Sequence, residues 1–220
     1  MFNQLGVHDF WLFMLTGTVL NLTPGADTLL VVSRSAAGGW RAGAVATMGT
    51  ALGCMVHATA AALGVAALLA ASQLAFQVLT WVGAAYLAYL GVQMLRQGVR
   101  RAADGALKAA TAAEPVQGML RRSFMQGLLT NLLNAKVGLF FLAFVPQFIA
   151  HDAPSKALAF VFLGAIFNVN GMLWCHALAL SSSFAGSRLA PGARVAAILE
   201  RTMGAVFVAL GVRLALATKD

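Results

Sequence analysis

Long apolar stretches separated by short polar segments recur along the whole chain. A membrane-spanning α-helix needs about 20 mostly apolar residues. Six stretches of that length lie near Phe10–Val32, Gly43–Ala70, Leu74–Leu95, Phe124–Ile149, Ala157–Ser181 and Val195–Ala217. The pattern predicts an all-α, polytopic membrane protein with six transmembrane helices, whose function lies within the bilayer.

Composition agrees with a lipid environment. Hydrophobic residues make up 60% of the chain and charged residues 10%, and the mean hydropathy is +0.81. Cys54 and Cys175 both fall in apolar stretches, where a free thiol usually behaves as a small hydrophobe. The first nine residues contain no Lys or Arg, so we expect an uncleaved first helix rather than a removed signal peptide.

The positive charges gather on one side of the predicted membrane. Eleven of the 15 Lys and Arg residues follow span one, lie in the segment 96–122, or flank the start of span six. The positive-inside rule then places that segment in the cytoplasm, near anionic lipid headgroups, and both termini outside. The formal net charge of +8 is therefore a topology signal, and we expect no nucleic-acid partner.

A polar, helix-breaking segment, NLTPGAD at residues 21–27, interrupts the first span. Thr23 is a favourable N-cap and Pro24 suits a first helical position, so a new half-helix is predicted there with Asp27 in its first turn. A charge at mid-depth costs about 2.5–3.5 kcal/mol, and backbone groups in hydrocarbon need internal partners. The segment must line protein or a water-filled cavity.

The two halves of the chain echo each other. NLTP at 21–24 recurs as NLLN at 131–134, and Leu52-Gly53 with His57 recurs as Leu163-Gly164 with Asn168. We expect a first three-helix repeat at 1–95, a basic cytoplasmic linker at 96–122 and a second three-helix repeat at 123–220. An odd number of spans inserts the second repeat upside down, so that broken helices one and four meet near the midplane.

The second break raises an electrostatic conflict. If Asn134 caps a half-helix, Lys136 adds positive charge to an end that is already positive. The conflict disappears if an anion binds there, either a substrate carboxylate or Asp27 across the repeat interface. A zwitterionic amino acid would satisfy both charges. The alternatives are an Asp27 that only compensates the helix dipole, a structural Asp27–Lys136 ion pair, or a Lys136 that extends to the membrane surface.

Several of these segments resemble the lysine exporter and homoserine/threonine efflux (LysE/RhtB) family. They are 21–27, 33–43, 52–57, 126–136 (QGLLTNLLNAK) and 140–148, and the similarity covers nearly the whole chain. Ala26 and Ala135 stand where the family usually has prolines, so the second break retains none. The resemblance implies secondary efflux of amino acids from the bacterial cytoplasm across the inner membrane.

We therefore expect an amino-acid exporter driven by proton antiport. Asp27 and His57 are the proposed carriers of the coupling proton, because intramembrane ionisable groups mark pathways and imidazole titrates near neutral pH. His57 continues the Gly49-x-x-x-Gly53 stripe, so it should face into the bundle, and a purely hydrogen-bonded packing role stays open. The expected substrate-binding residues are Asn21, Thr23, Pro24, Gly25, Asp27, Asn131, Asn134, Lys136 and Asn168.

One Asp and one Lys balance a zwitterion, which favours a neutral aliphatic or hydroxylated amino acid. Motifs for metalloproteases, dinucleotides and P-loops are absent, so no enzyme activity, cofactor or metal is expected. Small residues in spans two, three and six are compatible with a homodimer. A metal-cation transporter would need more converging ligands than Asp27. A thiol–disulfide electron carrier would need Cys54 and Cys175 at equivalent positions, which the repeat does not provide.

The charge asymmetry predicts the sidedness of three engineered cysteines in a background without Cys54 and Cys175. Ala103→Cys and Ser187→Cys should react with an impermeant maleimide only from the cytoplasmic side, and Ala153→Cys only from outside. Labelling of right-side-out and inverted vesicles measures this. The reverse pattern would overturn the orientation.

Overall fold

The computed structural model describes residues 5–71, 118–150 and 152–185, with isolated helical positions between 78 and 96 and between 198 and 212. Apart from those isolated positions, the predicted spans Leu74–Leu95 and Val195–Ala217, and most of the linker 96–122, lie outside the described residues. The repeat and the count of six spans therefore stay predictions. The described part is helical, apart from one isolated β-bridge between Val7 and Ile149.

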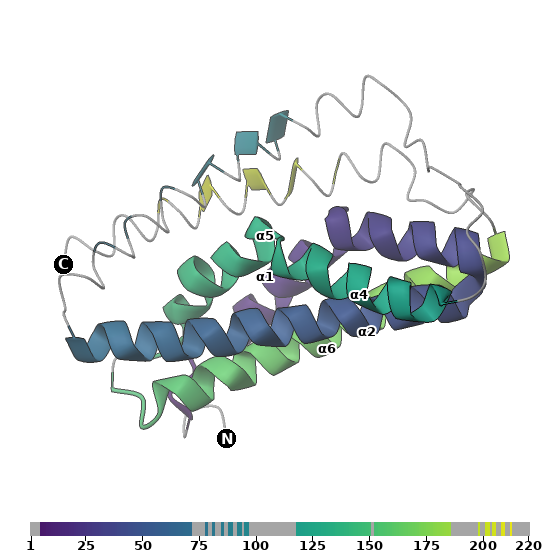
Figure 1. Cartoon of the computed structure of the whole chain (residues 1–220). Coiled ribbons are helices and arrows are strands. Elements are labelled where there is room, and N and C mark those ends of the chain that lie inside the picture. The colour runs from purple at the N-terminus through teal and green to yellow at the C-terminus, as the bar shows by residue number, and fades with distance from the viewer. Residues whose placement is uncertain are drawn as a thin grey trace.

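The described helices lie side by side along one long axis (Figure 1). They are α1 (Phe10–Leu22), α2 (Ala26–Ala71), α4 (Met119–Leu132), α5 (Ala135–Leu139) and α6 (Lys156–Ala185), with a π-helical turn η2 (Phe140–Phe144) and a 3-10 turn η3 (Val145–Phe148) after α5. α2 packs against both α4 and α6, and α1 packs against α6.

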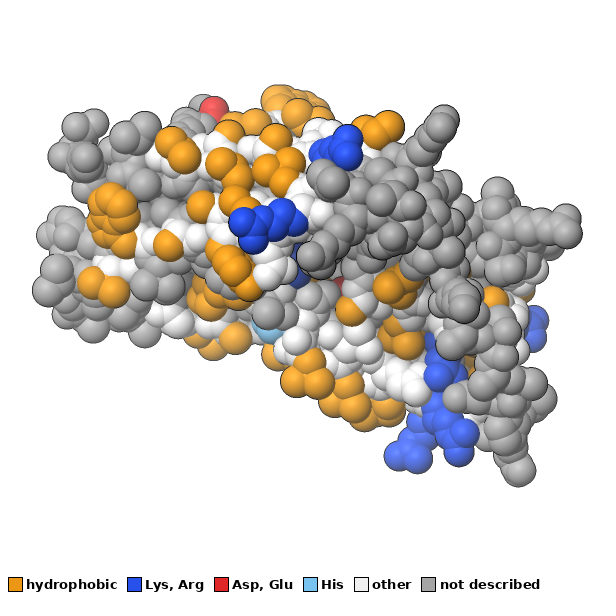
Figure 2. All heavy atoms as spheres, turned by 90° about the horizontal axis from the view of Figure 1, so that it is seen from above, with side chains coloured by type: hydrophobic (Ala, Val, Ile, Leu, Met, Phe, Trp, Pro, Cys, Tyr) orange, Lys and Arg blue, Asp and Glu red, His pale blue; other side chains and the backbone are white. Residues whose placement is uncertain are grey.

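Length and composition identify membrane spans within the described residues. Ala26–Gly64 and Lys156–Ser183 are each long and apolar enough to cross a membrane, and a third span is possible if the bent pair Met119–Leu132 and Lys136–Phe148, which meet at 49°, crosses as one. Figure 2 shows a face on which hydrophobic side chains are spread along the molecule and carboxylates are scarce. The chain is an integral membrane protein.

The first span is broken as predicted, but Thr23 does not cap the second half-helix. α1 ends at Leu22 and α2 begins at Ala26, and Thr23 donates from its backbone N–H and its hydroxyl to Val19 O. A threonine hydroxyl readily reaches the carbonyl four residues back, so Thr23 terminates α1 instead. Pro24 is therefore in the connection and not at a first helical position. Asp27 does lie in the first turn of α2.

Gly39 divides α2 into two helical parts. Its φ of 74° and ψ of 176° are not helical, and the positive φ suits glycine. A Cβ on Gly43 would collide with Ser35 Oγ, whereas eight residues of straight helix would separate the two Cα atoms by about 12 Å. The chain therefore reverses at Gly39, and residues 26–38 pack back onto the longer second part.

Glycines bring the α2 and α4 backbones into contact. A Cβ on Gly49 would collide with Phe124 O, and a Cβ on Gly127 would collide with Ala46 O. Further along the same face, a Cβ on Gly53 would lie 2.9 Å from Asn131 Oδ1. Small residues allow such close approach between helices in lipid. The Gly49-x-x-x-Gly53 stripe is thus a packing face, as predicted.

Phenylalanines fill the core where α1, η2 and α6 meet. The rings of Phe140 and Phe167 stack with centroids 4.5 Å apart, and Phe13 packs on Phe144 and Phe148. Phe140, Phe141 and Phe144 are each at most 1% exposed. Offset aromatic pairs add about 0.5–1.5 kcal/mol each beyond their buried area. This core fixes α1 relative to α6 next to the two helix breaks.

Replacing Gly127 with Ala should destabilise the folded protein by about 1–3 kcal/mol, because the new methyl group meets backbone that cannot rotate away. Thermal unfolding in detergent, followed by size-exclusion chromatography, measures the loss. Gly64→Ala is the matched control, since a Cβ there meets nothing within 4 Å. Equal melting temperatures for the two variants would contradict the close α2–α4 contact.

Candidate functional site

A cavity lies between the two helix breaks. Its volume is about 600 Å³ when the space at its open, solvent-facing side is included. Residues of α1, α2, α4, α5 and α6 line it. Of the predicted binding residues, those that line the cavity are Asn21, Thr23, Gly25, Asp27, Asn131, Asn134, Lys136 and Asn168. Pro24 and His57 do not line it. The fold therefore brings residues from the two breaks, about 110 positions apart, into one site.

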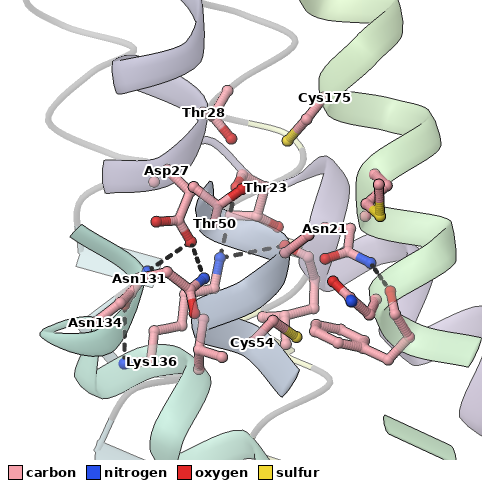
Figure 3. A pocket seen from close by; sticks show the side chains of 18 residues that line it. Asn21, Thr23, Asp27, Thr28, Thr50, Cys54, Asn131, Asn134, Lys136 and Cys175 are labelled. Carbon is pink, nitrogen blue, oxygen red and sulfur yellow. Dashed lines mark hydrogen bonds between the residues drawn. The ribbon is translucent and has the colours of Figure 1, made fainter. Parts of the chain in front are cut away.

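Two asparagine side chains from the second break hold the Asp27 carboxylate. Asp27 Oδ2 accepts hydrogen bonds from Asn131 Nδ2 at 2.9 Å and from Asn134 Nδ2 at 3.1 Å (Figure 3). The other oxygen, Oδ1, is buried and has no hydrogen-bond partner among the described residues. A buried carboxylate oxygen without a donor is costly.

Asn134 creates the second break without a proline. It is the N-cap of α5, with φ −80° and ψ 95°, and its Oδ1 accepts from the Lys136 backbone N–H at 3.1 Å. A side-chain oxygen at this position replaces the missing intrahelical partner. The predicted capping role is confirmed, and the same side chain also donates to Asp27. Ala135 in place of proline therefore does not prevent the break.

Lys136 reaches the end of α1. Its Nζ donates to Leu20 O at 3.2 Å and to Thr23 O at 3.5 Å. These are carbonyls at a helix C-terminus, where the helix dipole is negative, and Leu20 O also accepts from the Thr23 backbone N–H at 3.3 Å. This contact offsets the unfavourable position of Lys136 at the start of α5, and it rules out the alternative that Lys136 extends to the membrane surface. The lysine also acts electrostatically on Asp27.

His57 lies behind the cavity and faces into the bundle, as predicted. Its Nε2 lies 3.0 Å from Asn131 O, and because a carbonyl oxygen only accepts, this nitrogen is assigned the proton. A Cβ on Gly138 would lie 3.2 Å from the imidazole, so the ring is also packed. Asn131 thus connects His57, through its backbone, with Asp27, through its side chain.

α6 forms the opposite wall of the cavity. It contributes Phe167, Asn168, Gly171, Met172 and Cys175, none of which is charged. A polar network joins this wall to α1. Asn21 Nδ2 donates to Phe167 O at 3.2 Å and to Asn170 Oδ1 at 3.3 Å, and Asn170 Nδ2 donates to Thr18 Oγ1 at 2.8 Å.

Sequence reasoning missed several lining residues. They are Leu20, Thr28, Thr50, Ala51, Cys54, Val137, Phe167, Gly171, Met172 and Cys175. Thr50 lies within the Gly49–Gly53 stripe and could have been found there, whereas the apolar members look like ordinary core residues. Both cysteines are free thiols. Among the described residues, no group of three His, Cys, Asp or Glu side chains could hold a metal ion.

Comparisons with known proteins cover almost the entire chain. The LysE type translocator family matches residues 18–218. An uncharacterized membrane protein of Pseudomonas aeruginosa is 38% identical over 97% of this chain and 98% of its own. A leucine efflux protein of Klebsiella pneumoniae is 32% identical over 98% of each chain, and one of an Enterobacter species is 30% identical over 98% and 99%. No solved structure matches.

Replacing Asn134 separates its two roles. Asn134→Ala should lose both the α5 cap and a donor to Asp27, whereas Asn134→Ser keeps a capping oxygen but is too short to reach the carboxylate. We expect the alanine variant to be less stable than the serine variant by about 0.5–2 kcal/mol, the usual value of an N-cap. Unfolding titrations in mixed detergent micelles measure the difference. Equal stability of the two variants would contradict the capping role.

Proposed function

The chain belongs to the LysE family of translocators, and from that premise we propose that it exports a neutral amino acid from the bacterial cytoplasm across the inner membrane in exchange for protons. The relatives named as leucine efflux proteins support amino-acid efflux. The outward direction rests on the family, because an alternating-access site does not by itself fix the direction of flux.

The observation that carries this proposal is that Asp27 and Lys136 line the same cavity. Both line the space between the breaks, one near the start of α2 and the other near the start of α5. An α-ammonium group would donate to the Asp27 carboxylate, and an α-carboxylate would lie near Lys136. Hydrogen bonds to charged groups contribute about 1.5–3 kcal/mol each. The two ends of a zwitterion therefore fit groups already present in the cavity.

The cavity favours an uncharged substrate side chain. Asp27 is its only carboxylate among the described residues and Lys136 its only ammonium, so the α-ammonium and α-carboxylate would use both. A basic side chain would need a second acid, since an unpaired buried charge is strongly disfavoured. The leucine efflux relatives favour an aliphatic amino acid over a hydroxylated one.

A single carboxylate can also couple export to protons. Asp27 would hold either the substrate ammonium or a proton, and the two would exclude each other because both bind the same oxygens. Each release of substrate would then leave the carboxylate available for an incoming proton. His57 is connected to Asp27 through Asn131, whose backbone carbonyl contacts the imidazole and whose side chain donates to the carboxylate. We propose that His57 positions Asn131 rather than binding substrate.

Neutralising each charge tests the site. Asp27→Asn and Lys136→Gln should each reduce leucine flux per folded molecule at least tenfold, because one end of the substrate loses its partner at about 1.4 kcal/mol or more. The double variant should fold but should not recover transport. Leucine flux per folded molecule is measured in vesicles reconstituted with each of the three proteins. A near-normal flux in the double variant would show that the two charges form only a structural pair and would refute the site.

Matched surface variants control for the loss of charge itself. Asp152→Asn and Lys156→Gln remove the same charges at positions that do not line the cavity. Both should transport leucine at the rate of the unmodified protein. A loss in these variants equal to that of Asp27→Asn and Lys136→Gln would show that the effect does not depend on the cavity.

A further inference from the structure

The geometry points to Gly171 on α6 as the residue that sets the size of the substrate side chain. The inference rests on the proposed function, because it assumes that the amino acid binds between Asp27 and Lys136. All charged groups of the cavity, as described, come from the two breaks, while the facing α6 wall has none. A substrate anchored by its backbone charges would therefore direct its side chain toward α6.

Four cavity residues of α6 follow the spacing of one helical face. Asn168, Gly171, Met172 and Cys175 are separated by three, one and three positions, so they present a continuous surface to the substrate. Three of them carry side chains, whereas Gly171 has none, so the Asn21 amide packs directly against α6 at this position. An aliphatic substrate side chain would lie beside Asn21 and contact the thioether of Met172, which adapts readily to apolar ligands.

The space above Gly171 is limited by a fixed neighbour. A Cβ at this position would lie 3.1 Å from Asn21 Oδ1 and 3.3 Å from Asn21 Nδ2. Asn21 is held by hydrogen bonds to Phe167 O and Asn170 Oδ1, so it cannot move away without losing them. An added methyl group would have to push the Asn21 amide by a few tenths of an ångström, and because Asn21 also lines the cavity, this shift would reduce the room for the substrate.

Met172 provides a variant with the opposite effect. It lines the same wall and is partly buried. Met172→Ala would remove most of the side chain and widen the cavity on the side of α6. A purely structural defect would lower the affinity for all substrates together, whereas a size-determining wall requires that the two variants change the order of preference in opposite directions.

Competition binding to the purified, full-length protein in detergent tests the inference. The probe is radiolabelled leucine, displaced by unlabelled alanine, leucine and phenylalanine. Gly171→Ala should lower the affinity for leucine relative to that for alanine by about tenfold or more, which is the effect that one methylene group usually has in a closely fitting pocket. Met172→Ala should raise the affinity for phenylalanine relative to that for leucine. Gly64→Ala, which has open space around its Cβ, should leave all ratios unchanged.

Two results would overturn the inference in distinguishable ways. If the unmodified protein binds none of these amino acids, the proposed function fails and the inference fails with it. If it binds them but both variants keep the ratios of the unmodified protein, the proposed function stands and the role of the α6 wall is refuted. Should Gly171→Ala fail to fold, the ratio of phenylalanine to leucine in Met172→Ala decides the question alone.

Discussion

A broken helix can exist inside a membrane only if the polar groups at the break find hydrogen-bond partners, and here the two breaks contact each other. In lipid, an unsatisfied backbone group costs several kcal/mol. Lys136, from the second break, donates to the carbonyls of Leu20 in α1 and of Thr23 directly after it, at the first break. Asn131 and Asn134, also from the second break, donate to Asp27 at the first. These hydrogen bonds, all donated by the second break to the first, hold the two breaks face to face, and the cavity lies between them.

The same groups explain how a stable structure can also hold a ligand. The polar atoms at the breaks are largely paired with one another, so binding of the proposed substrate would exchange existing contacts for new ones, and only the difference in free energy would appear as affinity. Moderate affinity suits a carrier, which must release its substrate on the other side. On the proposed function, Asp27 Oδ1, which is buried and has no donor among the described residues, would accept from an ammonium group without giving up an existing hydrogen bond, once the groups that cover it move aside.

The sequence predicted the broken helices and the polar part of the cavity better than it predicted the partners of individual side chains. Apolar length, the NLTPGAD interruption and the lone charges at 27 and 136 were sufficient to predict the broken helices and most of the polar cavity residues. Thr23 was placed at the wrong helix end, because a threonine can either cap the helix that follows or donate to a carbonyl of the helix that precedes. The destination of the Lys136 side chain was left open among several alternatives, since its partners are backbone carbonyls that any sequence would supply.

The apolar wall on α6 could not be predicted for a different reason. In a chain that is 60% hydrophobic, residues such as Phe167, Met172 and Cys175 have no pattern that distinguishes a cavity wall from core. Their role depends on which helices meet, and that depends on the close packing of Gly49 and Gly127 between α2 and α4. Long-range packing therefore decides which part of an apolar helix faces the site.

The central claim is that Asp27 and Lys136 recognise opposite ends of one amino acid, and ligands that lack one end test it most directly. Isoamylamine keeps the ammonium of leucine without the carboxylate, and isocaproate keeps the carboxylate without the ammonium. Their competition with leucine should be measured by calorimetry in the unmodified protein, Asp27→Asn and Lys136→Gln. The account predicts that Asp27→Asn weakens the binding of isoamylamine and leaves that of isocaproate unchanged, while Lys136→Gln does the reverse. If either variant weakens both analogues equally, the two residues do not read the two ends of the substrate.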